Sequence, residues 1–139
     1  MKTRIYFLST LLIVAFAFFA FHVPQDQKKP APWKIDAKFK AMKNAAAGDA
    51  ESIKLGKALY AKHCKSCHGN AGLGDGPKAT NLETFPGNFS DAKFHAAYSD
   101  GELYYMTVFG RDEMPKFDSK IPDEEGRWAV VNYVRSLKK

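Results

Sequence analysis

Apolar residues recur at helical spacing in three stretches of the chain. The first covers residues 51–63, and the second begins at Ser99, which has the spacing of a capping box with Glu102. The third covers residues 122–137, with acidic side chains in its first turn and basic ones at its end, as the helix dipole favours. No stretch alternates as a strand would, so the pattern predicts an all-α domain of three main helices with long loops.

One helical face carries a spacing that predicts a helix crossing. Gly56, Tyr60 and Cys64 follow each other at intervals of four residues, so they share one face of the first helix. Glycine costs a helix about 1 kcal/mol relative to alanine, a cost that is easier to understand where two helices approach closely. Tyr133 and Val130 on the last helix are the natural partners for this face.

The N-terminal pattern differs from the rest of the chain. An apolar run of 19 residues, 5–23, follows Lys2 and Arg4. Signal-peptide cores are about 7–15 residues long and spanning helices about 20, so the length favours an uncleaved anchor over a cleaved signal peptide. We therefore predict that residues 1–23 are a signal peptide or an uncleaved N-terminal membrane anchor. In either case the leading basic residues keep that end cytoplasmic and place the domain outside the cytoplasm.

Residues 24–51 have the composition of a tether. Pro24, Pro30 and Pro32 stiffen a stretch rich in lysine and other polar residues. Trp33 is the exception, and it could lie at a membrane interface or dock on the domain surface. This division leaves residues 52–139 as the folded domain.

The net charge of +6 is located mainly in the arm. Residues 24–50 hold six lysines against three aspartates, whereas residues 51–139 hold 13 basic and 12 acidic residues. A nucleic-acid-binding domain would carry a basic stripe on its folded face. The near-neutral domain therefore argues against that class of function.

Cys64, Cys67 and His68 form the C-x-x-C-H signature of covalent haem attachment. Two thiols at this spacing can add to the two vinyl groups on one porphyrin edge, and the histidine that follows can bind the iron. The motif predicts one haem c. With three helices in a domain of this size the protein core is thin, and we expect the haem to complete it.

Other interpretations of the cysteine pair fit less well. A thioredoxin-like pair needs a preceding strand, and a structural zinc site needs four ligands, but these are the two cysteines of the chain. A disulfide at this spacing would be strained. The glycine-rich stretch 69–77 lacks the spacing and the preceding strand of a phosphate loop. It is better explained as a turn around the haem edge, where a backbone carbonyl near Gly76 or Pro77 could accept from the His68 ring.

Met114 is the best candidate for a second iron ligand. Pro115 disfavours a helical conformation for it and so holds its thioether on a loop. Met106 lies within the second predicted helix and is better explained by packing. His95 would give bis-histidine ligation, and an open iron site is the remaining possibility. His63, beside the attachment motif, is expected to be a solvated surface residue.

These motifs together resemble a class I monohaem c-type cytochrome of bacterial type. The likeness covers residues 52–139 and includes the glycine–tyrosine spacing, C-x-x-C-H, the methionine–proline pair and an aromatic C-terminal helix. It implies crossed first and last helices, His68 and Met114 as axial ligands, and electron transfer. The stretch between these ligands is shorter than in mitochondrial carriers, so the haem propionates have no assigned partners. Arg111, Trp128 and Tyr104 are the candidates, in that order.

The resemblance implies an electron carrier rather than an enzyme. Two protein ligands leave no iron position for a substrate, so we expect redox proteins as transiently docking partners, with no small-molecule substrate and no nucleic acid. The N-terminal segment would associate with the membrane on its extracytoplasmic (periplasmic) side. A haem subunit permanently docked in an oxidoreductase, or an open-site haem enzyme or gas sensor, are the alternatives.

Overall fold

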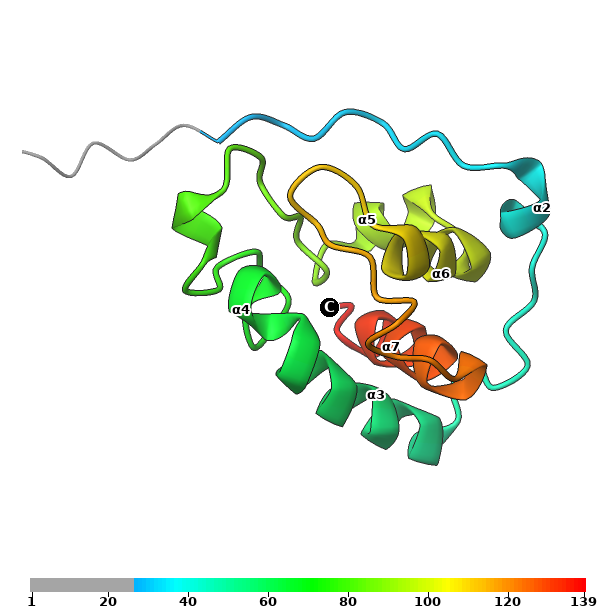
Figure 1. The fold of residues 1–139 in the computed structure, drawn as a ribbon. Helices are drawn as coiled ribbons and strands as arrows, with labels where there is room; N and C mark the ends of the chain where they lie inside the picture. Colours follow the sequence, from blue (N-terminus) through cyan, green and yellow to red (C-terminus); the bar gives the residue numbers. More distant parts are fainter. Residues whose placement is uncertain (1–26) are drawn as a thin grey trace, which may run out of the picture.

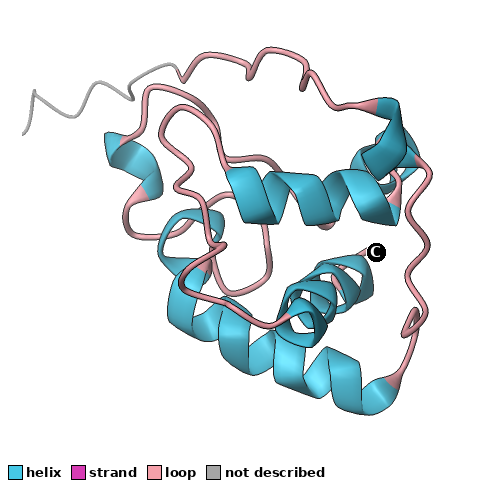
Figure 2. Cartoon of the chain, turned by 45° about the vertical axis from the view of Figure 1, so that its right-hand side comes forward, coloured by secondary structure: helices cyan, strands magenta, loops and turns pink. Residues whose placement is uncertain are grey.

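The computed structural model describes residues 27–139, so the predicted signal peptide or anchor lies outside the described residues. Helices and loops make up this part of the chain, without a β-strand (Figures 1 and 2). The helices are α2 (Ala37–Lys40), α3 (Ala50–His63), α4 (Lys65–His68), the 3-10 helix η1 (Ala79–Asn81), α5 (Ala92–Ala97), α6 (Asp100–Phe109) and α7 (Glu124–Ser136). Within the described residues no helix is long and apolar enough to cross a membrane. The all-α prediction is confirmed.

Helices α3 and α7 cross at Gly56, as the sequence predicts (Figure 1). A Cβ atom at Gly56 would overlap the backbone carbonyl of Ala129 and lie 2.9 Å from the Tyr133 Cβ atom. One turn further on, the rings of Tyr60 and Tyr133 meet with their centroids 5.0 Å apart. The glycine therefore lets the two helix backbones approach more closely than any side chain would permit.

Side-chain caps define where the three predicted helices begin. Asp49 accepts from the Ser52 amide at the start of α3. Ser99 and Glu102 form a full capping box on α6. Asp123 caps α7 by accepting from the Gly126 amide at 2.6 Å.

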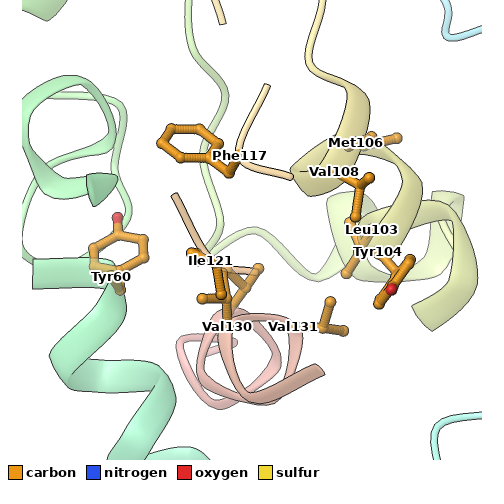
Figure 3. Packing of buried hydrophobic residues seen from close by; sticks show 10 residues of the cluster. Tyr60, Leu103, Tyr104, Met106, Val108, Phe117, Ile121, Val130 and Val131 are labelled. Carbon is orange, nitrogen blue, oxygen red and sulfur yellow. The ribbon is translucent and has the colours of Figure 1, made fainter. Parts of the chain in front are cut away.

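The core lies between α3, α6 and α7, and the loop residues Phe117 and Ile121 complete it (Figure 3). Tyr60, Ile121 and Val131 are its largest fully buried side chains. Met106 is buried in this cluster, with 6% of its surface exposed, which confirms the packing role expected for it. This core reaches the cysteine motif, because Cys64 and Met114 pack against it, and its apolar burial stabilises the domain.

Residues 27–44, which we call the N-terminal strap, pack against the helical domain. They run past α6 to α2 before the chain turns back towards α3 (Figure 1). The Phe39 ring lies against the rings of Tyr105 and Phe109, with centroids 4.8 and 5.5 Å away. Trp33 meets Tyr105 edge-on at 6.4 Å, so of its two predicted locations the structure gives it the domain surface. The segment expected to be a linker is thus in contact with the domain.

Candidate haem site

A cavity of about 690 Å³ lies among α4, the loop 81–87, the turn 111–115 and the strap. Cys64, Cys67, His68 and Met114 all line it. Its volume falls within the range of about 300–1,000 Å³ typical of cofactor and ligand sites. The structure therefore brings together the four residues that the sequence analysis selected for haem attachment and ligation.

The proximal residues are positioned by two consecutive short pieces of helix. Cys64 is the C-cap of α3, and α4 begins at the next residue. The amides of Cys67 and His68 donate to the Cys64 carbonyl at 3.2 and 3.0 Å. This tight turn gives both thiols access to one cavity, and in the structure both are free.

The glycine-rich stretch 69–77 donates backbone hydrogen bonds to α4. The Gly74 amide donates to the His68 carbonyl at 2.9 Å and the Gly76 amide to the Cys67 carbonyl at 3.1 Å. Gly69 and Gly74 have φ values of +80° and +78°, which other residues rarely adopt. Because these amides bond the chain itself, the stretch serves as a turn and offers no cradle for phosphate.

His68 has the properties of a metal-binding imidazole. Its ring is stacked on Phe89, with centroids 4.5 Å apart, and 9% of the residue is exposed. Burial lowers the pKa of His68 to about 4, and the Pro86 backbone opposes this shift only in part. The ring is therefore neutral at physiological pH, the state in which histidine binds metals.

The predicted hydrogen bond from the His68 ring to a backbone carbonyl can be checked at its Nδ1 atom. Its Nδ1 atom is buried without a hydrogen-bond partner among the described residues. The Pro86 backbone is close enough to affect the pKa of the ring, whereas Pro77 does not line the cavity. The predicted bond from His68 to a carbonyl near Gly76 or Pro77 is thus not formed in this structure, because the chain from Gly76 turns back onto α4, where the Lys78 amide donates to the Ser66 carbonyl.

Met114 reaches the cavity from a short hydrogen-bonded turn. The Arg111 amide donates to the Met114 carbonyl at 2.9 Å, and the Met114 amide donates to the Arg111 carbonyl at 2.8 Å. Asp112, inside this turn, has a φ of +48°. The Glu113 carboxylate accepts from the amides of Glu83 and Thr84 at 3.1 and 3.0 Å. The turn is therefore attached to the loop on the other side of the cavity mouth.

The rival ligands lie elsewhere. Met106 belongs to the buried core and does not line the cavity. His95 is also outside the cavity lining, and its two ring nitrogens lie 2.6 Å from the Phe89 carbonyl oxygen and 3.2 Å from an Arg135 nitrogen. Bis-histidine ligation through His95 would require these contacts to break.

The three propionate candidates have separate surroundings. Arg111 lines the cavity, but its two terminal nitrogens donate to the carbonyls of Pro32 and Ala31. Trp128 and Tyr104 pack on each other, with ring centroids 4.5 Å apart, and neither lines the cavity. Trp128 precedes Ala129 at the helix crossing, and that crossing lies two turns of α3, or about 12 Å, before the cysteines.

His63 is a site residue that the sequence analysis missed. It was expected to be solvated, but it lines the cavity, and its Nε2 atom is buried without a hydrogen-bond partner among the described residues. Its ring lies 6.0 Å from that of Phe117. Burial, with Lys62 and Lys120 nearby, lowers the pKa of His63. Its position directly before Cys64, at the end of α3, was the available signal.

The family model for cytochrome c matches residues 53–138. This chain belongs to the cytochrome c family. A search of curated proteins found no significant match. Among solved structures, the KustC0563 c-type cytochrome is 35% identical with a TM-score of 0.52, and the match covers 60% of this chain and 98% of that one. The family thus confirms the predicted fold and its cofactor, a covalently bound haem c, and supports electron transfer as its general role.

A second similar structure comes from a complex. It is a chain of the Kuenenia stuttgartiensis reducing HAO-like protein complex Kustc0457/Kustc0458, at 27% identity and a TM-score of 0.60. The match covers 81% of this chain but 52% of the other, so this chain spans about half of that relative's length.

The cavity residues fit the cofactor that the family implies. Two free thiols, a neutral buried imidazole with an unpartnered nitrogen, and a thioether meet in one partly apolar cavity. These are the donor types found around haem c.

Proposed function

We propose that this protein is a one-electron carrier in which Cys64 and Cys67 hold the haem through thioether bonds and His68 and Met114 bind its iron. The observation that carries the proposal is the meeting of all four side chains in one cavity. Bound haem supplies an iron that exchanges one electron, and a neutral methionine ligand raises its reduction potential.

The protein residues would keep the site closed and dry. Phe85, Phe94 and Phe117 line the cavity and lower its polarity, which favours the less charged reduced state. His68 is held by the Phe89 stack, so its ring needs little rearrangement when the redox state changes. If His68 and Met114 both hold the iron of the bound haem, external ligands would have no direct access to it.

Visible spectroscopy of the holoprotein tests this ligation. We expect the reduced protein to show no spectral change on addition of carbon monoxide, and the oxidised protein to show the weak iron–sulfur charge-transfer band. Rapid binding of carbon monoxide by the wild-type protein would instead favour an open-site haem enzyme or sensor.

A docked haem subunit is the second candidate, favoured by the similarity to a chain of an HAO-like complex. Purification from the native source at low and high salt separates the two. A carrier that docks transiently should elute alone at high salt, whereas a permanent subunit should keep its partner.

The apolar N-terminal run supports a further part of the proposal, a membrane-tethered location on the extracytoplasmic side. A tether would concentrate the haem near membrane-bound redox partners. Membrane fractionation with a high-salt wash, followed by intact mass measurement, checks this. Recovery as a soluble species lacking residues 1–23 would indicate a cleaved signal peptide and a freely diffusing carrier.

A further inference from the structure

We propose that the N-terminal strap is a functional part of the haem site, because it holds the 111–114 turn and so keeps Met114 on the iron. The inference rests on the proposed ligation by Met114. It assigns positioning roles to Trp33 and Arg111, and it gives a segment with the composition of a linker a part in excluding external ligands.

Arg111 forms the first connection between strap and turn. Its guanidinium donates to the Ala31 and Pro32 carbonyls at 2.6 and 3.1 Å, and it lies over the Trp33 ring, 4.1 Å from the centroid. The Arg111 backbone pairs with that of Met114 in both directions. Displacement of the strap would therefore release the side chain of the residue that closes the methionine turn.

Gln27 and Lys28, at the start of the strap, form a second connection, to a different loop. The Lys28 amide donates to the Glu83 carbonyl at 2.9 Å, and its carbonyl accepts from the Phe85 amide at 3.1 Å. Gln27 donates to the Leu82 carbonyl at 3.0 Å. The loop fixed in this way is the one whose amides bind the Glu113 carboxylate. The turn is thus connected to the strap in two ways: directly through Arg111, and indirectly through Glu113 and the loop that Lys28 binds.

The strap is also fixed beyond Trp33, so it is held both before and after the residues that line the cavity. Phe39 packs on α6, and the Asn44 amide donates to Asp100 and Asn132 at 2.9 and 2.6 Å. Pro30 and Trp33, between these anchors, line the cavity themselves. The strap therefore forms part of the cavity wall as well as supporting the turn.

Part of the turn is strained and exposed, so support from the strap matters there. Asp112 has a left-handed backbone conformation, and Asp112, Glu113 and Pro115 are exposed. Strained conformations persist only where the surroundings determine them. An external ligand can bind only while the turn is open, so its apparent affinity rises in proportion to the open fraction.

The test compares full-length holoprotein carrying Trp33→Ala with Lys34→Ala, the exposed neighbour on the same strap. We expect Trp33→Ala to bind carbon monoxide in the reduced state at least about tenfold more tightly than the control, equivalent to about 1.4 kcal/mol. Hydrogen exchange should show faster exchange of the Arg111 and Met114 amides in the same variant. Trp33→Phe, which keeps a ring over Arg111, should restore most of the protection.

The outcomes separate this inference from the ligation on which it rests. If wild-type protein excludes carbon monoxide and Met114→Ala admits it, while Trp33→Ala and Arg111→Lys behave as Lys34→Ala, the strap has no positioning role. If wild type and Met114→Ala bind carbon monoxide equally, the ligation itself is wrong. Should Trp33→Ala fail to fold by far-ultraviolet circular dichroism, Arg111→Lys decides, because it keeps the charge but loses the paired carbonyl contacts.

Discussion

The two sides of the haem cavity are built in different ways. On the proximal side, the candidate groups lie within five consecutive residues, Cys64 to His68, and one helical turn orients them. On the distal side, the proposed ligand Met114 lies on the turn 111–115, which contacts the strap and the loop 81–87, and these three segments lie far apart in the sequence. The first arrangement is local, and the second exists only when the chain is folded.

This difference predicts different kinds of failure. Proximal changes should remove the cofactor and with it the fold, because the cavity would be left empty. Distal changes should leave the haem attached and the helices in place while altering access to the iron. The following experiments test this distinction, from the largest expected effect to the smallest.

The double variant Cys64→Ala with Cys67→Ala should lose the covalent haem and most of its helical structure. The haem would fill a cavity of about 690 Å³, and without it a domain this small has little buried surface to hold the lining loops in place. Acid-acetone extraction followed by far-ultraviolet circular dichroism measures both effects, with Ser66→Ala as the control within the motif. Retention of colour by the extracted double variant would contradict the attachment through these thiols.

Met114→Ala should keep the haem and the fold but lose the iron–sulfur band, lower the potential and admit carbon monoxide. Met106→Ala is the matched control, because Met106 is buried in the core with 6% exposed. It should cost about 2–5 kcal/mol of unfolding free energy while keeping the band. The assignment is wrong if the two variants exchange these phenotypes.

Gly56→Ala should lower the unfolding free energy by about 1–3 kcal/mol, because the new methyl group overlaps the Ala129 carbonyl at the helix crossing. The loss should occur even though alanine favours helix by about 1 kcal/mol over glycine. Guanidinium denaturation measures it against Lys57→Ala, an exposed neighbour expected to change stability by about 0.5 kcal/mol or less. Unchanged stability in Gly56→Ala would show that the helices can separate at no cost.

Tyr60→Phe should have the smallest effect, about 0.5–1.5 kcal/mol, because it removes the hydroxyl that donates to the buried Gly69 carbonyl at 2.8 Å. Burial raises the pKa of Tyr60 above its ordinary value of 10.0. Its contribution is therefore complete below pH 10 and falls at higher pH, where only the unfolded chain ionises. Denaturation at neutral and alkaline pH should show a shallower alkaline loss in the variant, and equal slopes would exclude this role.

The three main helices and their crossing could be predicted because each depends on local signals. Capping residues such as Ser99 act on amides within three residues, and Gly56 shares a helical face with Tyr60 through helix geometry alone. The alanine- and lysine-rich composition of residues 34–47 predicted partial helix there, and α2 lies within it, whereas the short helices α4 and α5 were not predicted. They have four to six residues each, too few for a periodic pattern, and packing stabilises them.

The site residues show the same difference between local signals and contacts that depend on packing. C-x-x-C-H and the Met114–Pro115 pair stand out in the sequence because covalent spacing and proline stereochemistry act between neighbours. His63 did not stand out, because whether a histidine faces solvent or a cavity depends on what packs beside it. Trp128 was chosen as a propionate candidate for its residue type, but in the structure it packs on Tyr104 near the helix crossing.

By itself, the sequence determined the cofactor, the long helix that leads into the attachment motif and, through a set of short motifs, the family, since each of these signals acts between residues close together in the chain. The tertiary structure decided that residues 27–44 lie against the domain and that Arg111 bonds them with both terminal nitrogens. The physical reason is that those contacts join residues some 80 positions apart. Composition can show that a proline- and lysine-rich segment is soluble and extended, but only packing can show which carbonyls it presents to an arginine.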